Sequence, residues 1–265
     1  MMPIHKAKQP PLTPNEKTII KFVDAHFESQ LAEALRRIGK DDFDPGWLND
    51  LVWSEKLVDV TSPALAKELA LGYGVGGEKL SAYLPSDLAE EYISTWVENE
   101  AASQFIRETT FDFAKAVNDT THDKFRDAML KAEEAGETIP ERKKRISSLF
   151  KGFDEGNRAE RIARTETLNA LHEGSTRQWK DSGVVTGKIW DAAGDACPFC
   201  TFMDGKRVGI DDVFYSKGDV LEVDVPGRDT PARLNLNYRD TKHPPIHTMC
   251  RCDIEPELIP LSELR

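Results

Sequence analysis

Apolar residues recur at helical spacing through the first half of the chain, after an arm that is rich in proline. The apolar positions that share the first helix face are Ile19, Phe22, Val23, Phe27, Leu31 and Leu35. Before them, Thr13, Pro14 and Glu16 form the pattern of a capping box with proline at the first helical position. This pattern predicts an amphipathic helix that starts at Pro14 and ends near Gly39.

The next segment combines helical spacing with several helix breakers. Breaks at 44–46 and at 62–63 predict two shorter helices, which end in the glycine cluster "GYGVGG" of residues 72–77. The cluster does not follow a strand and is not followed by Lys-Ser or Lys-Thr. We therefore interpret it as a helix C-cap and flexible joint rather than a phosphate loop. Further helices are predicted over 85–117, 121–135 and 140–151.

The hydrophobic pattern changes after Gly183. Short β-rich runs flank a hairpin-type turn at Asp204–Gly205, and residues 214–245, which lack a clear period, are expected to form a long loop. The predicted fold class is α+β. A helical region over residues 1–152 precedes a smaller module over residues 153–265, with a long helix, short strands and a cysteine-stapled loop.

Composition and charge describe a soluble globular protein. Apolar residues make up 39% of the chain and charged residues 31%, with a formal net charge of −11 and a pI of about 5.1. No apolar run is long enough for a membrane span, and the start of the chain lacks the apolar stretch of a secretory signal. We therefore expect a protein that stays on the cytosolic side and has no membrane partner.

One basic segment interrupts this acidic chain. Its candidate nucleic-acid-binding residues are Arg142, Lys143, Lys144, Arg145, Arg158, Arg161 and Arg164. The alternative is a solvated helix face with intrahelical acidic partners, namely Glu155, Glu160, Glu166 and Glu173. The predicted helix over 155–174 also has a side of small residues, which predicts close approach of a neighbouring element; they are Ala159, Ala163, Ala170 and Gly174.

Four cysteines in two close pairs are the strongest chemical signal. "CPFC" presents Cys197 and Cys200 at a turn, and "HTMCRC" brings His247, Cys250 and Cys252 from distant sequence. Two such pairs can close a tetrahedron around a structural zinc ion, with five candidate ligands for four places. Arg251 is expected to offset the negative charge of such a site. The alternative is four reduced thiols that only pack.

Two catalytic interpretations of the cysteines are less favoured. A glutaredoxin-like thiol would lie at the start of a helix of several turns, but Asp204–Gly205 turns the chain soon after Cys200, so we expect no such helix. A Cys-His hydrolase needs one activated thiol, and paired cysteines are poor candidates for that role. A thiol oxidoreductase and a zinc-dependent hydrolase, nuclease or toxin-like effector remain the alternatives to a non-enzymatic protein.

Four pieces in a fixed order resemble the phage Mu F-like head morphogenesis family of minor head proteins. They are the helix with "IARTE", the C-P-x-C sequence, the Asp-Gly turn after it and the terminal C-R-C, all within residues 155–256. The resemblance implies a virion component and not an enzyme. It also implies association with the portal vertex, and a role in head assembly or in handling DNA at packaging and ejection.

The resemblance further implies partners. The expected partners are the portal protein, a capsid or scaffolding protein and phage DNA, with the helical first 152 residues docking to portal or capsid. The protein would be found in the virion, and in the host cytoplasm during assembly.

Overall fold

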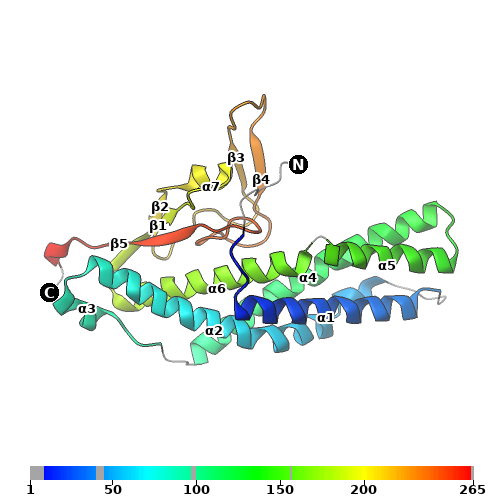
Figure 1. The fold of residues 1–265 in the computed structure, drawn as a ribbon, viewed down its shortest axis with the longest axis horizontal. Helices are drawn as coiled ribbons and strands as arrows, with labels where there is room; N and C mark the ends of the chain where they lie inside the picture. Colours follow the sequence, from blue (N-terminus) through cyan, green and yellow to red (C-terminus); the bar gives the residue numbers. More distant parts are fainter. Residues whose placement is uncertain (1–8, 40–44, 97–99, 156, 264–265) are drawn as a thin grey trace. The chain divides into compact units, whose positions relative to one another are not determined.

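The computed structural model describes residues 9–39, 45–96, 100–155 and 157–263 (Figure 1). The α-helices within them are α1 (Pro14–Arg37), α2 (Leu51–Tyr83), α3 (Ser86–Tyr92), α4 (Glu100–Glu134), α5 (Ile139–Glu155), α6 (Arg158–Ser182) and α7 (Pro198–Met203). The strands are β1 (Val185–Asp191), β2 (Arg207–Gly209), β3 (Val220–Val223), β4 (Ala232–Asn235) and β5 (Asp253–Leu258), and two 3-10 helices are η1 (Pro45–Asn49) and η2 (Leu261–Glu263). The predicted α+β class is confirmed.

Two compact units account for the fold. Unit 1 comprises Met1–Pro11, Lys67–Val97 and Arg164–Arg265, and unit 2 comprises Leu12–Ala66 and Glu98–Ala163. Helices α2 and α6 contribute residues to both. The predicted division into regions 1–152 and 153–265 concerns roles as well as folding, and it stays a prediction. None of the described helices is long and apolar enough to cross a membrane.

The strands of unit 1 form two small antiparallel sheets. In the first, β1 lies between β2 and β5, as Figure 1 shows. In the second, β3 pairs with β4 inside the segment for which the sequence predicts a long loop. That prediction is wrong because each strand has only four residues, which is too short for a clear alternating pattern. Leu221 and Val223 nevertheless bury one face of β3.

Most predicted helices are present, and their boundaries differ in informative ways. Helix α1 has the predicted capping box: the Glu16 backbone N–H donates to Thr13 Oγ1 at 3.1 Å, and the Thr13 N–H donates to the Glu16 carboxylate at 2.7 Å. The single helix predicted over 85–117 is instead α3 and the start of α4. Helix α4 then continues through the separate helix predicted after residue 121.

Helix α2 corrects the interpretation of the glycine cluster as a joint. The helix runs without a break through Pro63 and through all four glycines of the cluster. Within unit 1, a Cβ atom at Gly72 would collide with the Leu171 carbonyl oxygen, and one at Gly76 would lie 2.7 Å from the Ser175 Cα. Gly174 is equally close to the backbone of α2. The glycines therefore permit helix packing instead of ending a helix, and the close approach predicted on the Gly174 side is confirmed.

A buried polar network links three helical segments of unit 2. The Asn118 Oδ1 accepts hydrogen bonds from His26 Nε2 at 2.8 Å and from Gln30 Nε2 at 2.9 Å. The Asn118 Nδ2 donates to the Ser54 hydroxyl at 3.0 Å. His26 is also packed edge-on against Trp53. Because the Asn118 oxygen can only accept, the Nε2 of His26 carries a proton in this contact.

His26 should make the stability of the protein depend on pH. Burial lowers its pKa from the ordinary 6.5; the hydrogen bond to Asn118 opposes this, and the charges of Lys56 and Arg158 add to it. Below about pH 6.5 the unfolded chain therefore binds a proton at His26 that the folded chain does not. We expect the free energy of unfolding to decrease by up to about 1.4 kcal/mol for each unit by which the pH is lowered in this range.

Urea unfolding at about pH 7.5 and about pH 5.5 measures this effect. The His26→Gln variant retains a side-chain N–H donor but cannot titrate, so its stability should lose less between the two pH values. An equal loss in the variant and in the wild type would assign the pH dependence to other groups.

Candidate metal centre

The β1–β5 pairing brings the two cysteine pairs to the same end of a sheet. Cys197 is the N-cap of α7, which follows β1, and Cys200 lies in its first turn. Cys250 and Cys252 directly precede β5. Because β1 and β5 run antiparallel, the end of β1 lies beside the start of β5, and the Sγ atoms of Cys200 and Cys250 are 3.7 Å apart. The convergence that the sequence predicts for the two pairs is therefore present.

Helix α7 bears on the redox interpretation of the CPFC segment. The sequence predicts that the turn at Asp204–Gly205 leaves no room for a helix of several turns after Cys197. A helix does follow, but it has six residues and ends at Met203, directly before the turn. This is less than two turns. The longer helix of the glutaredoxin-like interpretation is not formed by these residues.

His247 faces the CPFC pair through one ring nitrogen. Its Nε2 lies 3.1 Å from the Cys197 Sγ and 3.2 Å from the Cys200 Sγ. Its Nδ1 lies 2.8 Å from the Thr248 carbonyl oxygen and donates to it. A backbone acceptor on the far nitrogen is the usual way in which a metal-binding imidazole is oriented, because it leaves the other nitrogen with a free lone pair.

The donor set fits zinc. Cys197, Cys200 and His247 form one trio whose ligand atoms all lie within 4.8 Å of one another, and Cys200, Cys250 and Cys252 form a second. In a tetrahedral site with Zn–S bonds of about 2.3 Å, two sulfurs lie roughly 3.8 Å apart. The Cys200–Cys250 distance of 3.7 Å matches this value. The trios share Cys200, which would therefore be a ligand in a single site formed from members of both.

The thiols lie in an apolar core. All four cysteines are buried in a cluster that includes Trp190, Met203 and Leu221. The hydrogen bond with Cys200 lowers the pKa of Cys197, against the opposing effect of burial, and raises the pKa of Cys200 itself. A thiolate is therefore stabilised at Cys197 even without an ion, as a metal ligand requires.

Arg251, between the two cysteines of the second pair, forms an ion pair with Asp195. The sequence predicts that it offsets the charge of a metal–thiolate site. Its guanidinium is instead shared with a carboxylate from the segment before α7, so its effect on the thiols is reduced. The ion pair also ties the two cysteine segments together.

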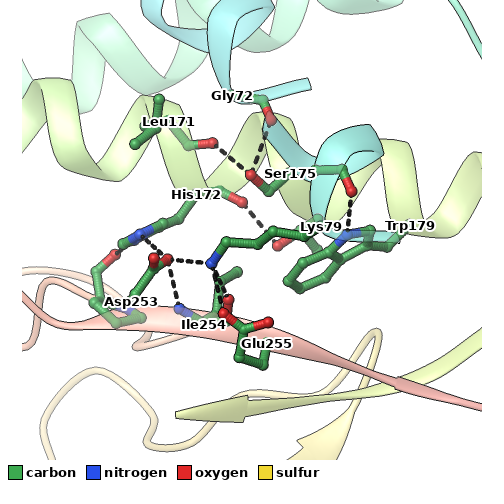
Figure 2. Close-up of polar contacts among 12 residues, drawn as sticks. Gly72, Lys79, Leu171, His172, Ser175, Trp179, Asp253, Ile254 and Glu255 are labelled. Carbon is green, nitrogen blue, oxygen red and sulfur yellow. Dashed lines mark hydrogen bonds and ion pairs between the residues drawn. The ribbon is translucent and has the colours of Figure 1, made fainter. Parts of the chain in front are cut away.

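A polar network lies beside this centre, and no local pattern in the sequence indicates it (Figure 2). Lys79 of α2 contacts the Asp253 carboxylate at 2.8 Å, the Glu255 carboxylate at 3.0 Å and the Ile254 carbonyl oxygen at 2.6 Å. His172 of α6 contacts the same Asp253 oxygen at 3.2 Å. The start of β5, directly after Cys252, is thus fixed to both helices. No spacing rule connects these residues, which come from three distant segments.

Ser175, His172 and Asp253 are the residue types of a hydrolase, but they do not form its geometry. The Ser175 hydroxyl donates to the Gly72 carbonyl oxygen at 2.8 Å, within the helix contact. Both ring nitrogens of His172 are engaged, with the Pro244 carbonyl oxygen at 2.9 Å and with Asp253. An imidazole in this position cannot take a proton from Ser175. The arrangement is structural.

A second buried imidazole repeats this arrangement. His243 Nδ1 lies 2.8 Å from the Pro244 carbonyl oxygen, and His243 Nε2 lies 3.4 Å from the Glu173 carboxylate. The rings of His172 and His243 pack edge to face, with centroids 5.8 Å apart. The "HPP" segment is thereby anchored to α6. In the alternative of a solvated helix face, Glu173 is expected to have an intrahelical partner; it has that contact, with Arg177, and the contact with His243 as well.

The "IARTE" motif has a similar anchoring role. The Glu166 carboxylate is buried, and it accepts hydrogen bonds from the Tyr238 hydroxyl at 3.0 Å and from the Arg239 guanidinium at 2.7 Å. In the alternative of a solvated helix face, Glu166 is expected to be an intrahelical partner of basic residues. Here it holds the loop after β4 against α6 instead. No local pattern could have indicated this role, because the partners of Glu166 lie 72 and 73 positions away in the sequence.

Two of the predicted nucleic-acid-binding arginines are buried. Arg158 donates to the Val117 carbonyl oxygen at 3.1 Å, and Arg164 donates to the Pro10 carbonyl oxygen at 2.8 Å. Only Arg161 of this trio is exposed. The spacing of three residues is present as predicted, but it does not give one solvated arginine face. Because Arg158 and Arg164 are buried and donate to backbone carbonyl oxygens, their positions do not support contact with an extended DNA strand.

The second basic group lies on α5 and is partly neutralised. Arg145 forms an ion pair with Glu137, and Arg142 donates to the Glu137 carbonyl oxygen at 3.0 Å. Lys144 is exposed and Lys143 is half-buried. The prediction of nucleic-acid binding by these seven residues is untested and stays a prediction.

One comparison with known proteins finds a family that matches the chain. A family model described as phage Mu protein F like protein matches residues 123–255, which is half of the chain. These residues include the "IARTE" helix and all four cysteines. No curated protein and no solved structure matches the chain. On the strength of this match and of the motifs it contains, the chain belongs to the phage Mu protein F like family.

Proposed function

We propose that this protein is a minor structural component of a phage head that acts at the portal vertex. Membership of the phage Mu protein F like family indicates a phage head morphogenesis protein and a place in the virion. The family match over residues 123–255 is the observation that carries the proposal. The proposed partners are the portal protein and a capsid or scaffolding protein, with assembly in the host cytoplasm.

Zinc has a structural role in this proposal. Cys197, Cys200 and Cys250 would hold it, with His247 or Cys252 as the fourth ligand. Bound zinc supplies a strong, redox-inactive cross-link between distant segments. Five protein ligands for four positions favour a closed site, whereas a catalytic zinc keeps a position for water. The same argument weakens the alternative of a zinc-dependent hydrolase, nuclease or effector.

The chain's own residues support a scaffold rather than a reaction centre. The buried polar groups of the matched region hold segments together: Glu166 holds the loop after β4, and His172 and Lys79 hold β5. A fixed module of this kind suits a protein that must keep its shape within a large assembly. A role in DNA packaging or ejection is the further part of the proposal, and it needs the exposed basic residues Lys144 and Arg161.

Co-purification with heads tests the function. We expect a tagged copy, expressed during phage growth, to sediment with assembled heads and to cross-link to the portal protein, because a portal-vertex component is carried in the particle. The sedimented fractions are analysed by mass spectrometry, with a tagged unrelated acidic protein as the control. Absence from purified heads, or recovery equal to that of the control, would refute the proposal.

A further inference from the structure

Two sulfur atoms from distant segments of unit 1 are in direct contact. The Sγ atoms of Cys200 and Cys250 are 3.7 Å apart. Both residues are free cysteines, and both are buried. A disulfide bond is about 2.05 Å long, so the two sulfurs together have to close about 1.7 Å to form one. The pair therefore has the proximity that a disulfide needs.

Contacts other than those of the sulfur atoms hold the two segments together. Asp191, at the end of β1, lies opposite Asp253, at the start of β5, in the antiparallel pairing of the two strands. Arg251 forms an ion pair with Asp195, which lies between β1 and α7. The approach of the two cysteines is thus a consequence of strand pairing, and the segments that carry them need not be brought together for the bond to form.

We infer that Cys200 and Cys250 are a site of oxidative modification, at which hydrogen peroxide forms a disulfide bond in the metal-free chain. One thiolate sulfur attacks a peroxide oxygen and breaks the O–O bond, which gives a sulfenic acid and a hydroxide ion. The second thiolate attacks the sulfenic sulfur and displaces a second hydroxide ion as the S–S bond forms. The hydroxide ions take up the protons of the two thiols. Two thiols and one peroxide therefore give one disulfide and two molecules of water.

The burial of the pair selects a small oxidant. Cys200 is 0% exposed and Cys250 is 6% exposed, and both lie in the apolar cluster that includes Trp190, Met203 and Leu221. Glutathione disulfide has to bring its own sulfur to the thiol, and it is too bulky to do so in the folded chain. Hydrogen peroxide is little larger than a water molecule and is not excluded in this way.

The disulfide would join the same two segments as a zinc ion, namely the start of α7 and the residues before β5. The linked cysteines are 50 positions apart, so the bond strongly restricts the unfolded chain. For this equivalence the inference rests on the structural role proposed for zinc: oxidation replaces a cross-link that is lost when the ion leaves. A protein carried in a virion leaves the reducing cytoplasm of the host, and disulfides persist in oxidising surroundings.

Peptide mapping of the full chain is the test, because trypsin separates the cysteines that have to be distinguished. Peptide 189–206 contains both cysteines of the CPFC segment, peptide 243–251 contains Cys250 and peptide 252–265 contains Cys252. The chain is treated with a chelator, exposed to hydrogen peroxide, alkylated at the remaining thiols and digested. We expect mass spectrometry to find peptide 189–206 joined to peptide 243–251, with the loss of two hydrogen atoms, and dithiothreitol to separate them.

Cys197→Ser is the matched control, because it removes the other thiol of the same peptide. It should retain the link, whereas Cys200→Ser should abolish it. Glutathione disulfide at the same concentration should give about tenfold less linked peptide than hydrogen peroxide, because the folded chain excludes it.

Three results would overturn the inference: no link in the wild type, a link that persists in Cys200→Ser, or a link to peptide 252–265 in place of 243–251. Equal linking by glutathione disulfide would also overturn it, since the reacting pair would then not be the buried one. Zinc content is measured on the same preparation before chelation. A chain that forms the link but held no zinc supports the modification site and contradicts only the role proposed for zinc.

Discussion

Replacement of Cys200 by serine is expected to abolish zinc binding and to lower the free energy of unfolding by several kcal/mol. Within the described residues, Cys200 belongs to both ligand trios, so its loss breaks each of them. An ion that binds only the folded chain stabilises it by about 4 kcal/mol when its free concentration is a thousand times its dissociation constant. Zinc content is measured by mass spectrometry, and stability by urea unfolding with and without a chelator.

Thr201→Ala is the control for this prediction. Thr201 is the exposed neighbour of Cys200 on α7, and it should retain one zinc ion per chain. His247→Ala and Cys252→Ser, compared with each other, identify the fourth ligand, because only the variant that removes it should lose the ion. Wild-type protein produced with zinc but containing none would show that the thiols only pack.

Alanine at Gly72 or at Gly174 is expected to cost about 3 kcal/mol or more of folding free energy. At each position the new Cβ atom would collide with a carbonyl oxygen of the facing helix, that of Leu171 for Gly72 and that of Leu69 for Gly174. The colliding atoms belong to backbone, so a change of rotamer cannot relieve the contact and the helices must separate. Urea unfolding of each variant measures the loss.

Gly74→Ala is the matched control in the same glycine cluster. No atom lies within 4 Å of a Cβ atom built there, and the position is in the interior of α2. Alanine should therefore stabilise the protein, by roughly 0.5–1 kcal/mol, because it lowers the entropy of the unfolded chain and has the higher helix propensity. Equal effects at Gly72 and Gly74 would contradict the packing seen in unit 1.

The helix boundaries show which features of the fold local sequence patterns can predict. The start of α1 was predictable because Thr13 and Glu16 stabilise it through contacts three residues apart. The continuity of α2 was not, since Pro63 and four glycines each weaken a helix locally. Burial of Leu57, Leu65 and Leu69 along one side, together with the backbone contact made by Gly72, offsets those local costs. The contact of Gly72 is with Leu171, which is 99 positions away in the sequence.

The candidate site divides in the same way. The five metal-ligand candidates were predictable because cysteine and histidine types at close spacing indicate their chemistry directly. Their convergence needed the β1–β5 pairing, which the structure supplies. The anchoring roles of Lys79, His172 and Glu166 were not predictable, because each contacts a partner remote in sequence. The burial of Arg158 was equally hidden, since spacing of three residues is compatible with either a solvated or a packed face.

By itself, the sequence determined the fold class, most helix positions, the set of thiol and imidazole ligands and the family to which the chain belongs. These depend on residue types and on spacings of a few positions, and the corresponding interactions are local or carried by one motif. Only the tertiary structure decided that the glycines of α2 pack rather than hinge, that β3 and β4 form a hairpin, and that the arginines at 158 and 164 are buried. Each of these depends on backbone or side chains that become neighbours only when distant segments fold together.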